Sequence, residues 1–298
     1  MADLGFDGRV AIITGAGGGL GRSHALDLAK RGALVVVNDL GGSVDGTGSG
    51  TTAAQAVVDE IKEAGGEAVA NYDSVATPEG GEAIVQAAVD AFGKVDIVIN
   101  NAGILRDKAF HNMEPDLMNP VLDVHLKGAF YVTRPAWVKM REQGYGRVVN
   151  TSSGAGIFGN FGQTNYGAAK MGLVGLTRVL AVEGAKSNIK VNAIAPVAHT
   201  RMTEDILGPI AERLAPEWVT PIVTWLAHED CPVTGEVFSV GGGRVAKVFI
   251  GVTPGYANTE SLSPEDVRDH FDQIRSEDGY AVPANLNEEL GLALKALA

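Results

Sequence analysis

The sequence predicts an α/β fold in which helices cover both faces of one doubly wound parallel sheet. Short apolar, β-branched runs alternate with longer segments of helical periodicity along most of the chain, which is the pattern of strand–helix–strand units. A cluster of glycines follows the first apolar run. Glycine also makes up 39 of the 298 residues, about twice its usual ~7% share, which indicates many tight turns and close backbone approaches.

The expected strands are almost uniformly apolar, as a sheet buried on both faces requires. They are residues 10–14, 34–38, 68–72, 95–100, 147–151, 189–194 and 237–240. The expected helices are residues 20–31, 52–64, 79–92, 116–142, 165–186 and 217–228. Right-handed crossovers between such parallel strands give a doubly wound sheet.

An uneven charge distribution divides the chain into two expected domains, 1–253 and 254–298. The whole chain carries 24 Lys and Arg against 36 Asp and Glu, a net charge of −12. Residues 254–298 hold 9 of these acids and 3 of these bases, so half of the net charge lies in the last 45 residues. We expect 1–253 to form the sheet domain. We expect 254–298, with a helical pattern at 264–275, to be an extension packed on that domain or on a partner subunit.

The composition limits the classes of partner. A net charge of −12 argues against nucleic acid as a partner, because nucleic-acid binders neutralise phosphates. No apolar stretch approaches the ~20 residues of a membrane helix, so no membrane partner is expected. Cys231 is the only cysteine, and no signal peptide is recognisable, which favours a cytoplasmic location. No cluster of side chains has the spacing of a metal site.

The glycine cluster predicts a Rossmann-type dinucleotide site. Residues 14–21 read TGAGGGLG, between the first expected strand and the first expected helix. Glycines there let the backbone approach a pyrophosphate closely, and the helix N-terminus offers free N–H groups to the anion. A glycine cluster alone is weak evidence, but its place after the first strand of an alternating pattern strengthens the prediction.

Acidic residues at the ends of the next two strands favour NAD as the cofactor. Asp39 ends the second strand, 20 residues after Gly19. A carboxylate there can accept hydrogen bonds from the adenosine ribose and would repel the 2′-phosphate of NADP. No Lys or Arg follows Asp39 within ten residues. Asp73, after the third strand, is placed to face the adenine, and the segment NNAG at 100–103 ends the fourth strand beside the same cleft.

Three polar side chains in the middle of the chain form a candidate catalytic set. Tyr166 and Lys170 lie four residues apart on an expected helix, so they share one face. Ser153 stands 13 residues before Tyr166, at the end of the fifth expected strand. The Tyr–Lys pair is weak evidence by itself, but its combination with the glycine turn and the NNAG segment is specific.

Together these motifs resemble the short-chain dehydrogenase/reductase family. Further segments, among them NYDSV at 71–75 and GNFGQ at 159–163, resemble the dehydrogenase part of the peroxisomal multifunctional enzymes of type 2, and the likeness continues into the C-terminal extension. The resemblance implies an NAD-dependent oxidoreductase that interconverts (3R)-3-hydroxyacyl-CoA and 3-oxoacyl-CoA in fatty acid β-oxidation. The implied cofactor-binding residues are Gly15, Gly19, Leu20, Gly21, Asp39, Asp73, Ser74, Asn101, Tyr166, Lys170 and Thr200.

The resemblance also implies catalytic roles. Tyr166 is the general base in alcohol oxidation, Lys170 lowers the pKa of Tyr166 and holds the nicotinamide ribose, and Ser153 orients the substrate oxygen. His125 stands where the family commonly has an Asn that supports a water near the lysine. We expect His125 either to hold its helix in place or to relay protons. The usual Pro-Gly after the sixth strand is Pro-Val at 196–197, which leaves the backbone geometry there open.

Other functions compete with this interpretation. A 17β-hydroxysteroid dehydrogenase is the nearest rival, because this branch of the family handles both kinds of substrate. A 3-oxoacyl carrier protein reductase is less favoured, because such enzymes generally use NADPH. A non-catalytic NAD-binding sensor is disfavoured by the retention of Ser153, Tyr166 and Lys170. The resemblance further implies a homodimer or homotetramer assembled through the helices 116–142 and 165–186.

Overall fold

The protein is described by a computed structural model that covers residues 4–198 and 213–295. The chain forms two compact units, Met1–Lys247 and Val248–Ala298. Thr200, one of the expected cofactor-binding residues, lies outside the described residues.

The first unit is built on one twisted sheet of eight strands. Their order across the sheet is β3 (Glu67–Asn71), β2 (Leu34–Asn38), β1 (Val10–Thr14), β4 (Ile97–Asn100), β5 (Gly146–Thr151), β6 (Ile189–Pro196), β7 (Val237–Gly241) and β8 (Arg244–Val248). The pairs from β3 to β7 are parallel. The strand order reverses between β1 and β4, which is where open sheets of this kind bind ligands. The predicted doubly wound α/β fold is confirmed.

The sequence does not predict β8. This strand follows β7 after Gly242 and Gly243, whose φ angles are 56° and 80°. Two successive residues with positive φ form the kind of turn that joins the strands of a hairpin. The side chains of β8 are partly or fully exposed, so the strand lacks the apolar run that identifies the central strands.

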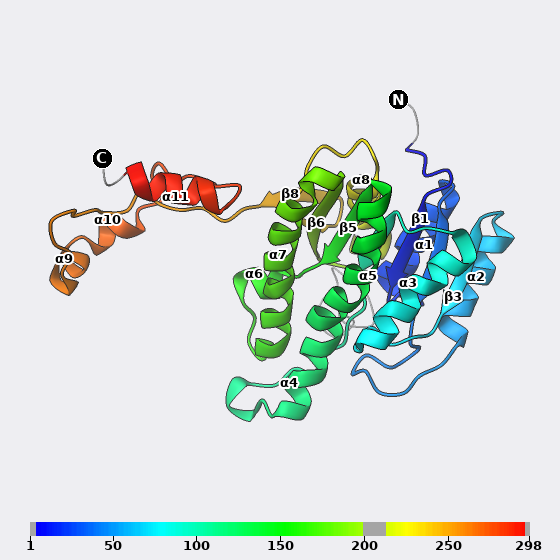
Figure 1. Ribbon diagram of the computed structural model, residues 1–298. Coiled ribbons are helices and arrows are strands. Elements are labelled where there is room, and N and C mark those ends of the chain that lie inside the picture. The colour runs from blue at the N-terminus through cyan, green and yellow to red at the C-terminus, as the bar shows by residue number, and fades with distance from the viewer. Residues whose placement is uncertain (1–3, 199–212, 296–298) are drawn as a thin grey trace. The chain divides into compact units, whose positions relative to one another are not determined.

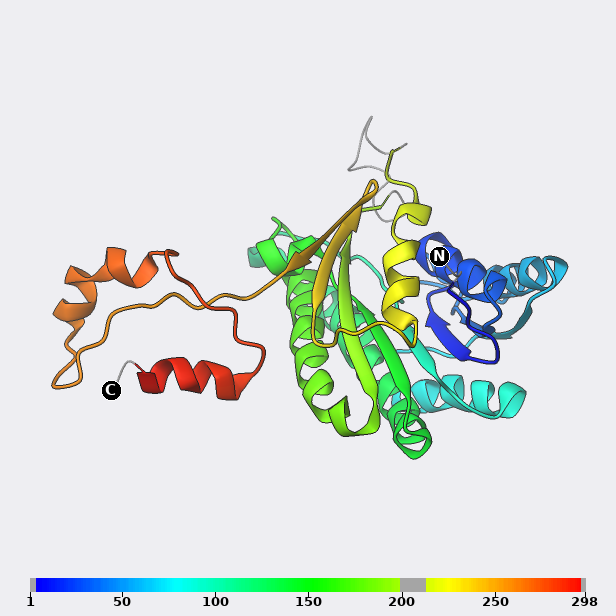
Figure 2. The ribbon, with the colours of Figure 1, turned by 90° about the horizontal axis from the view of Figure 1, so that it is seen from above.

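Helices cover both faces of the sheet (Figures 1 and 2). One apolar core joins the sheet to α1 (Gly19–Lys30), α2 (Thr52–Glu63) and α8 (Thr220–Ala227). A second core joins it to α3 (Pro78–Phe92), α5 (Gly128–Gln143) and α7 (Thr164–Gly184). Every residue of β1 is buried between these layers, which explains its uninterrupted apolar sequence.

The expected helix at 116–142 is not one regular helix. It consists of α4 (Pro115–Leu122), a π-helical turn at Asp123–Lys127, and α5. A π-helical turn inserts an extra residue into the helix, and such turns often occur at functional sites. This one carries His125. Shorter elements of the first unit are η1 (Phe110–Asn112), α6 (Gly154–Phe158), η3 (Ala185–Ser187) and η5 (Pro216–Trp218).

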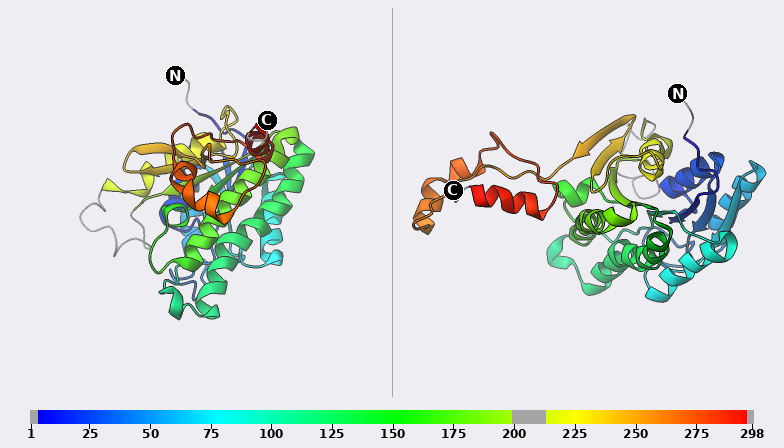
Figure 3. Two further views of the ribbon diagram at one scale, coloured as in Figure 1. Left: turned by 90° about the vertical axis from the view of Figure 1, so that its left-hand side faces the viewer. Right: turned by 45° about the horizontal axis from the view of Figure 1, so that its top comes forward.

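The described part of the second unit, 248–295, contains three short helices, drawn in orange to red in Figure 3. They are α9 (Pro264–Asp269), α10 (Phe271–Arg275) and α11 (Leu286–Lys295). Ser263 and Asp266 form a reciprocal capping box that starts α9, and an isolated antiparallel bridge joins Val252 to Ala281. In the described part of the chain, no helix combines the length and apolar character that a membrane span needs.

Candidate active site

A cavity of about 650 Å³ lies at the carboxyl ends of the central strands, beside the point where the strand order reverses. Nearly all of the site residues expected from the sequence line this cavity. The expected site residues that line it are Gly15, Gly19, Leu20, Asp39, Asp73, Ser74, Asn101, His125, Ser153, Tyr166 and Lys170. One cleft therefore contains both the expected cofactor residues and the expected catalytic residues.

The glycine turn gives the cavity a wall without side chains. Gly15 has a φ of 64°, and a Cβ atom on it would lie 2.7 Å from Ala102 Cα. Gly21 does not line the cavity; it lies behind the turn, where a Cβ atom would be 2.3 Å from Gly15 O. No side chain caps the start of α1, and its first turn has no acidic residue. Its N-terminus is therefore suited to bind an anion.

Two backbone N–H groups hold the Asp39 carboxylate. Its Oδ2 accepts a hydrogen bond from Gly17 N at 2.8 Å, and its Oδ1 accepts one from Gly41 N at 2.7 Å. Lys170 is the only Lys or Arg among the described residues that line the cavity. The cavity wall near Asp39 therefore offers acceptors and no cation.

The side chains of Asn101 and Asp73 are also held by hydrogen bonds to residues at the ends of strands. Asn101 Nδ2 donates to Thr14 O at 3.0 Å and to Gly15 O at 3.1 Å, so this side chain braces the glycine turn. Asp73 Oδ2 accepts a hydrogen bond from Asn71 Nδ2 at 2.7 Å. Asn101 therefore supports the glycine turn as well as lining the cavity.

The catalytic candidates Ser153, Tyr166 and Lys170 come together at the other end of the cavity. Ser153 is the N-cap of α6, and its hydroxyl is hydrogen bonded to the Tyr166 phenol. Lys170 Nζ lies 5.4 Å from the centre of the Tyr166 ring and donates to Thr151 O at 2.5 Å. One turn of α7 separates Tyr166 from Lys170, as the spacing predicts.

Burial sets the electrostatics of this group. It raises the pKa of the Tyr166 phenol, while the hydrogen bond from Ser153 opposes that shift. Burial also lowers the pKa of Lys170 to about 7. The net direction for the Tyr166 pKa is therefore upward, and the effect of Lys170 on that pKa stays a prediction.

His125 is a neutral, buried residue next to this group. Burial and the nearby charge of Lys170 hold its pKa well below the usual range. Its Nε2 lies 3.0 Å from Ile104 N and 2.8 Å from Ile104 O, and its ring packs edge-on against Tyr166 at 5.1 Å between centroids. A Cβ atom on Gly103 would overlap the ring, at 2.3 Å from its Cε1 atom. His125 therefore fixes the backbone that follows the NNAG segment.

A second, much smaller cavity adjoins the catalytic group. It measures about 10 Å³, and His125, Lys170 and Asn100 are among its lining residues. A cavity needs about 10–15 Å³ to hold one water molecule, so this one is at the lower limit. The Nδ1 atom of His125 is buried and has no hydrogen-bond partner among the described residues.

Several supporting residues are not predicted from the sequence. Asn165 Nδ2 donates to Arg106 O at 2.9 Å and to Leu117 O at 3.0 Å, and its Oδ1 accepts from Tyr166 N at 2.7 Å. Asn165 thereby fixes the start of α7 against two distant segments. Its position next to Tyr166 is the only signal in the sequence that could have drawn attention to it.

The comparisons with known proteins agree with this geometry. The short-chain dehydrogenase family profile matches residues 9–208. The chain belongs to the short-chain dehydrogenase family. The predicted family is therefore confirmed, and the chain is an oxidoreductase of the kind that acts on CH–OH groups.

Relatives similar over nearly the whole chain include multifunctional enzymes. The peroxisomal multifunctional enzyme type 2 of Mus musculus is 49% identical over 298 residues, which are 99% of this chain and 40% of the mouse protein. A short-chain type dehydrogenase/reductase of Mycobacterium tuberculosis is 54% identical, over 93% of this chain and 98% of its own length. The solved full-length enzyme of Drosophila melanogaster superposes with a TM-score of 0.84 at 39% identity, covering 99% of this chain and 50% of that one. This chain thus spans about half or less of the two multifunctional enzymes.

The comparisons overturn the cytoplasmic location expected from the sequence. The mouse and Drosophila relatives are named as peroxisomal enzymes. The single cysteine shows only that no disulfide can form within the chain, which does not identify a compartment. Delivery to an organelle depends instead on short address signals that receptors read, which composition does not reveal.

No group of three or more His, Cys, Asp or Glu side chains is arranged to hold a metal ion within the part of the chain that the structure describes.

Proposed function

We propose that this protein is an NAD-dependent dehydrogenase that interconverts (3R)-3-hydroxyacyl-CoA and 3-oxoacyl-CoA. The observation that carries the proposal is the convergence of Ser153, Tyr166 and Lys170 on the same 650 Å³ cavity as Asp39 and the glycine turn. A cofactor held at one end of this cavity and a substrate oxygen at the other would meet at the catalytic group.

The residues at the cofactor end fit NAD. The glycine turn, in which a Cβ atom on Gly15 or Gly21 would collide with backbone, leaves room for a pyrophosphate against the N-terminus of α1. Asp39 offers acceptors to ribose hydroxyls and would repel a 2′-phosphate, and the described cavity wall has no cation beside it. When bound, the nicotinamide ring supplies the acceptor for the hydride that leaves the substrate carbon.

The chain itself supplies proton transfer and orientation. Ser153 donates a hydrogen bond to the substrate oxygen and orients it toward Tyr166. The Tyr166 phenolate removes the hydroxyl proton in the oxidation, and the phenol returns a proton in the reduction. A charged Lys170 favours the phenolate. Because the pKa of Lys170 is about 7, its charge is sensitive to conditions near neutrality.

The substrate class rests on the resemblance to the multifunctional enzymes, which extends over 99% of the chain. A small-molecule substrate agrees with the family, and a thioester of CoA agrees with the relatives. The C-terminal region, 254–298, takes part in this resemblance, and we propose that it is an integral part of the enzyme rather than a separate functional domain.

We also propose that the protein is a homodimer or homotetramer. Exposed apolar side chains lie along α5 and α7, where the sequence predicts a subunit interface. They are Phe130, Val138, Met171, Val179 and Val182. Light scattering tests this proposal, and a monomeric mass at micromolar concentration would reject it.

The decisive test of the function is a kinetic panel with NAD. It uses (3R)- and (3S)-3-hydroxyacyl-CoA of several chain lengths and a 17β-hydroxysteroid. We expect turnover of the (3R)-thioesters and little of the (3S)-isomers. Turnover of the steroid alone would instead support the hydroxysteroid function, and absence of turnover with every thioester would reject the proposal.

A further inference from the structure

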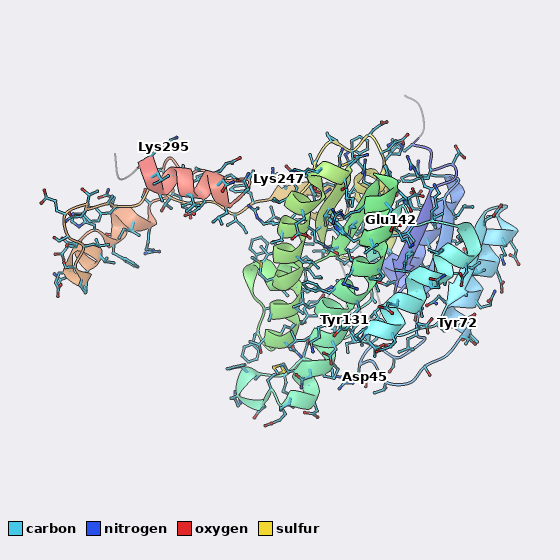
Figure 4. All side chains as sticks on the ribbon, viewed as in Figure 1. Asp45, Tyr72, Tyr131, Glu142, Lys247 and Lys295 are labelled. Carbon is cyan, nitrogen blue, oxygen red and sulfur yellow. The ribbon has the colours of Figure 1, made fainter. Side chains whose placement is uncertain are left out.

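The glycine-rich loop between β2 and α2, residues 41–50, has a defined shape. Its composition predicts a flexible loop, but the Asp45 side chain, labelled in Figure 4, is hydrogen bonded to two other residues of the loop. Asp45 Oδ1 accepts hydrogen bonds from Ser43 Oγ at 2.6 Å, from Thr47 N at 3.0 Å and from Thr47 Oγ1 at 2.7 Å. These hydrogen bonds lower the pKa of Asp45 to about 2. The loop is therefore organised around an ionised carboxylate.

This loop forms part of the wall of the large cavity. Its lining residues are Gly42, Ser43, Val44 and Gly46. The loop also begins beside Asp39, whose Oδ1 accepts the hydrogen bond from Gly41 N at 2.7 Å. The carboxylate that would recognise the ribose and the first peptide of the loop are thus joined directly.

Three contacts attach the tip of the loop to the segment that follows β4. Val44 O accepts a hydrogen bond from Leu105 N at 3.0 Å. Gly46 packs so closely against Ile104 that a Cβ atom on it would lie 3.0 Å from Ile104 Cδ1. The third contact is the Arg106 side chain, whose Nε donates to Asp45 O at 2.9 Å.

Arg106 connects this loop to other parts of the site. Its Nη1 donates to Asp116 O at 2.7 Å, in the first turn of α4. Its own carbonyl accepts the hydrogen bond from Asn165, the residue before Tyr166. A planar guanidinium can hold two carbonyl groups at once, which neither an ammonium nor an apolar side chain can reproduce in the same geometry.

We propose that Arg106 is a positioning residue that fixes loop 41–50 as the wall for the adenosine half of the cofactor. This inference rests on the proposed NAD-dependent function. If the Arg106 side chain is lost, the loop keeps its internal bonds but loses its anchor to α4. Asp39 is then less firmly placed, because Gly41 moves with the loop.

Direct binding of ADP-ribose, measured by calorimetry without any turnover, tests the proposal. Arg106→Met should weaken ADP-ribose binding about tenfold or more, the effect of losing one charge-assisted hydrogen bond. Arg106→Lys should lie between Arg106→Met and the wild type. Arg31→Met is the matched control, because Arg31 also joins two segments, through Asp27 Oδ2 and Leu4 O, but lies away from the cavity. It should leave binding unchanged.

A pair of glycine variants tests the same wall without changing charge. Gly46 and Gly48 have φ angles of 81° and 76°, so an alanine meets similar backbone strain at either position. Only Gly46→Ala would press on Ile104, because no atom lies within 4 Å of a Cβ on Gly48. We expect Gly46→Ala to weaken ADP-ribose binding clearly more than Gly48→Ala does.

The outcomes separate this inference from the proposed function. Wild-type protein that does not bind ADP-ribose would overturn the proposed cofactor and this inference with it. Wild-type protein that binds ADP-ribose, with Arg106→Met binding it equally well, would overturn only the positioning role. A lower melting temperature of Arg106→Met with an unchanged dissociation constant would likewise reject it, because that result describes a purely structural residue. A raised KM for NAD with kcat at saturation within a fewfold of wild type supports it.

Discussion

Gly17→Ala tests how the glycine turn positions Asp39. A Cβ atom on Gly17 would lie 2.8 Å from Asp39 Oδ2 and 2.8 Å from Ala53 Cβ, whereas ordinary contacts begin at 3.4 Å. Each of these two contacts must therefore lengthen by about 0.6 Å, so both groups are displaced relative to residue 17. Asp39 is the freer of the two, since Ala53 is held in α2. Its displacement breaks the 2.8 Å hydrogen bond from Gly17 N.

The magnitude follows from that hydrogen bond. A hydrogen bond to a charged group contributes about 1.5–3 kcal/mol, which corresponds to about a 10- to 150-fold increase in the dissociation constant for NAD. The assay is titration of the protein with NADH, followed by its fluorescence. Gly18→Ala is the control, because no atom lies within 4 Å of a Cβ on Gly18. Binding by Gly17→Ala within twofold of the wild type would refute the reasoning.

Three further predictions concern single side chains. Tyr166→Phe should lower kcat by about 10²- to 10⁴-fold and keep the affinity for NADH, since the ring contact with His125 remains; unchanged turnover in a steady-state assay would contradict the general-base role. Asp39→Ala should lower the ratio of kcat/KM for NAD over NADP at least about tenfold, and an unaltered ratio would reject the role given to Asp39. His24 is buried with a pKa of about 3, against about 6.5 in the unfolded chain. Below pH 6.5 the unfolded state binds the extra proton, so the free energy of unfolding should fall by up to about 5 kcal/mol between pH 6.5 and 3. Urea titrations should show a shallower fall in His24→Gln, and equal slopes would exclude His24 as the cause.

The sequence by itself determines the features of this protein that are local in the chain. Seven of the strands are short, largely apolar runs, because the central strands of a parallel sheet are buried on both faces. The glycine turn, Asp39 and the pair Tyr166 and Lys170 are also predictable. Each depends on a spacing within one strand–turn–helix unit or one helix.

Only the tertiary structure decides the features that depend on contacts between distant segments. Arg106 and Asn165 gain their roles from partners 10 to 61 residues away in the sequence, so no local pattern identifies them. The directions in which the pKa values of Tyr166 and Lys170 move are set by burial, which spacing does not report. The same reason applies to loop 41–50. Its composition indicates a flexible chain. Its attachment comes from hydrogen bonds to the segment after β4, which form only because the sheet brings the carboxyl ends of β2 and β4 to the same edge, on either side of β1.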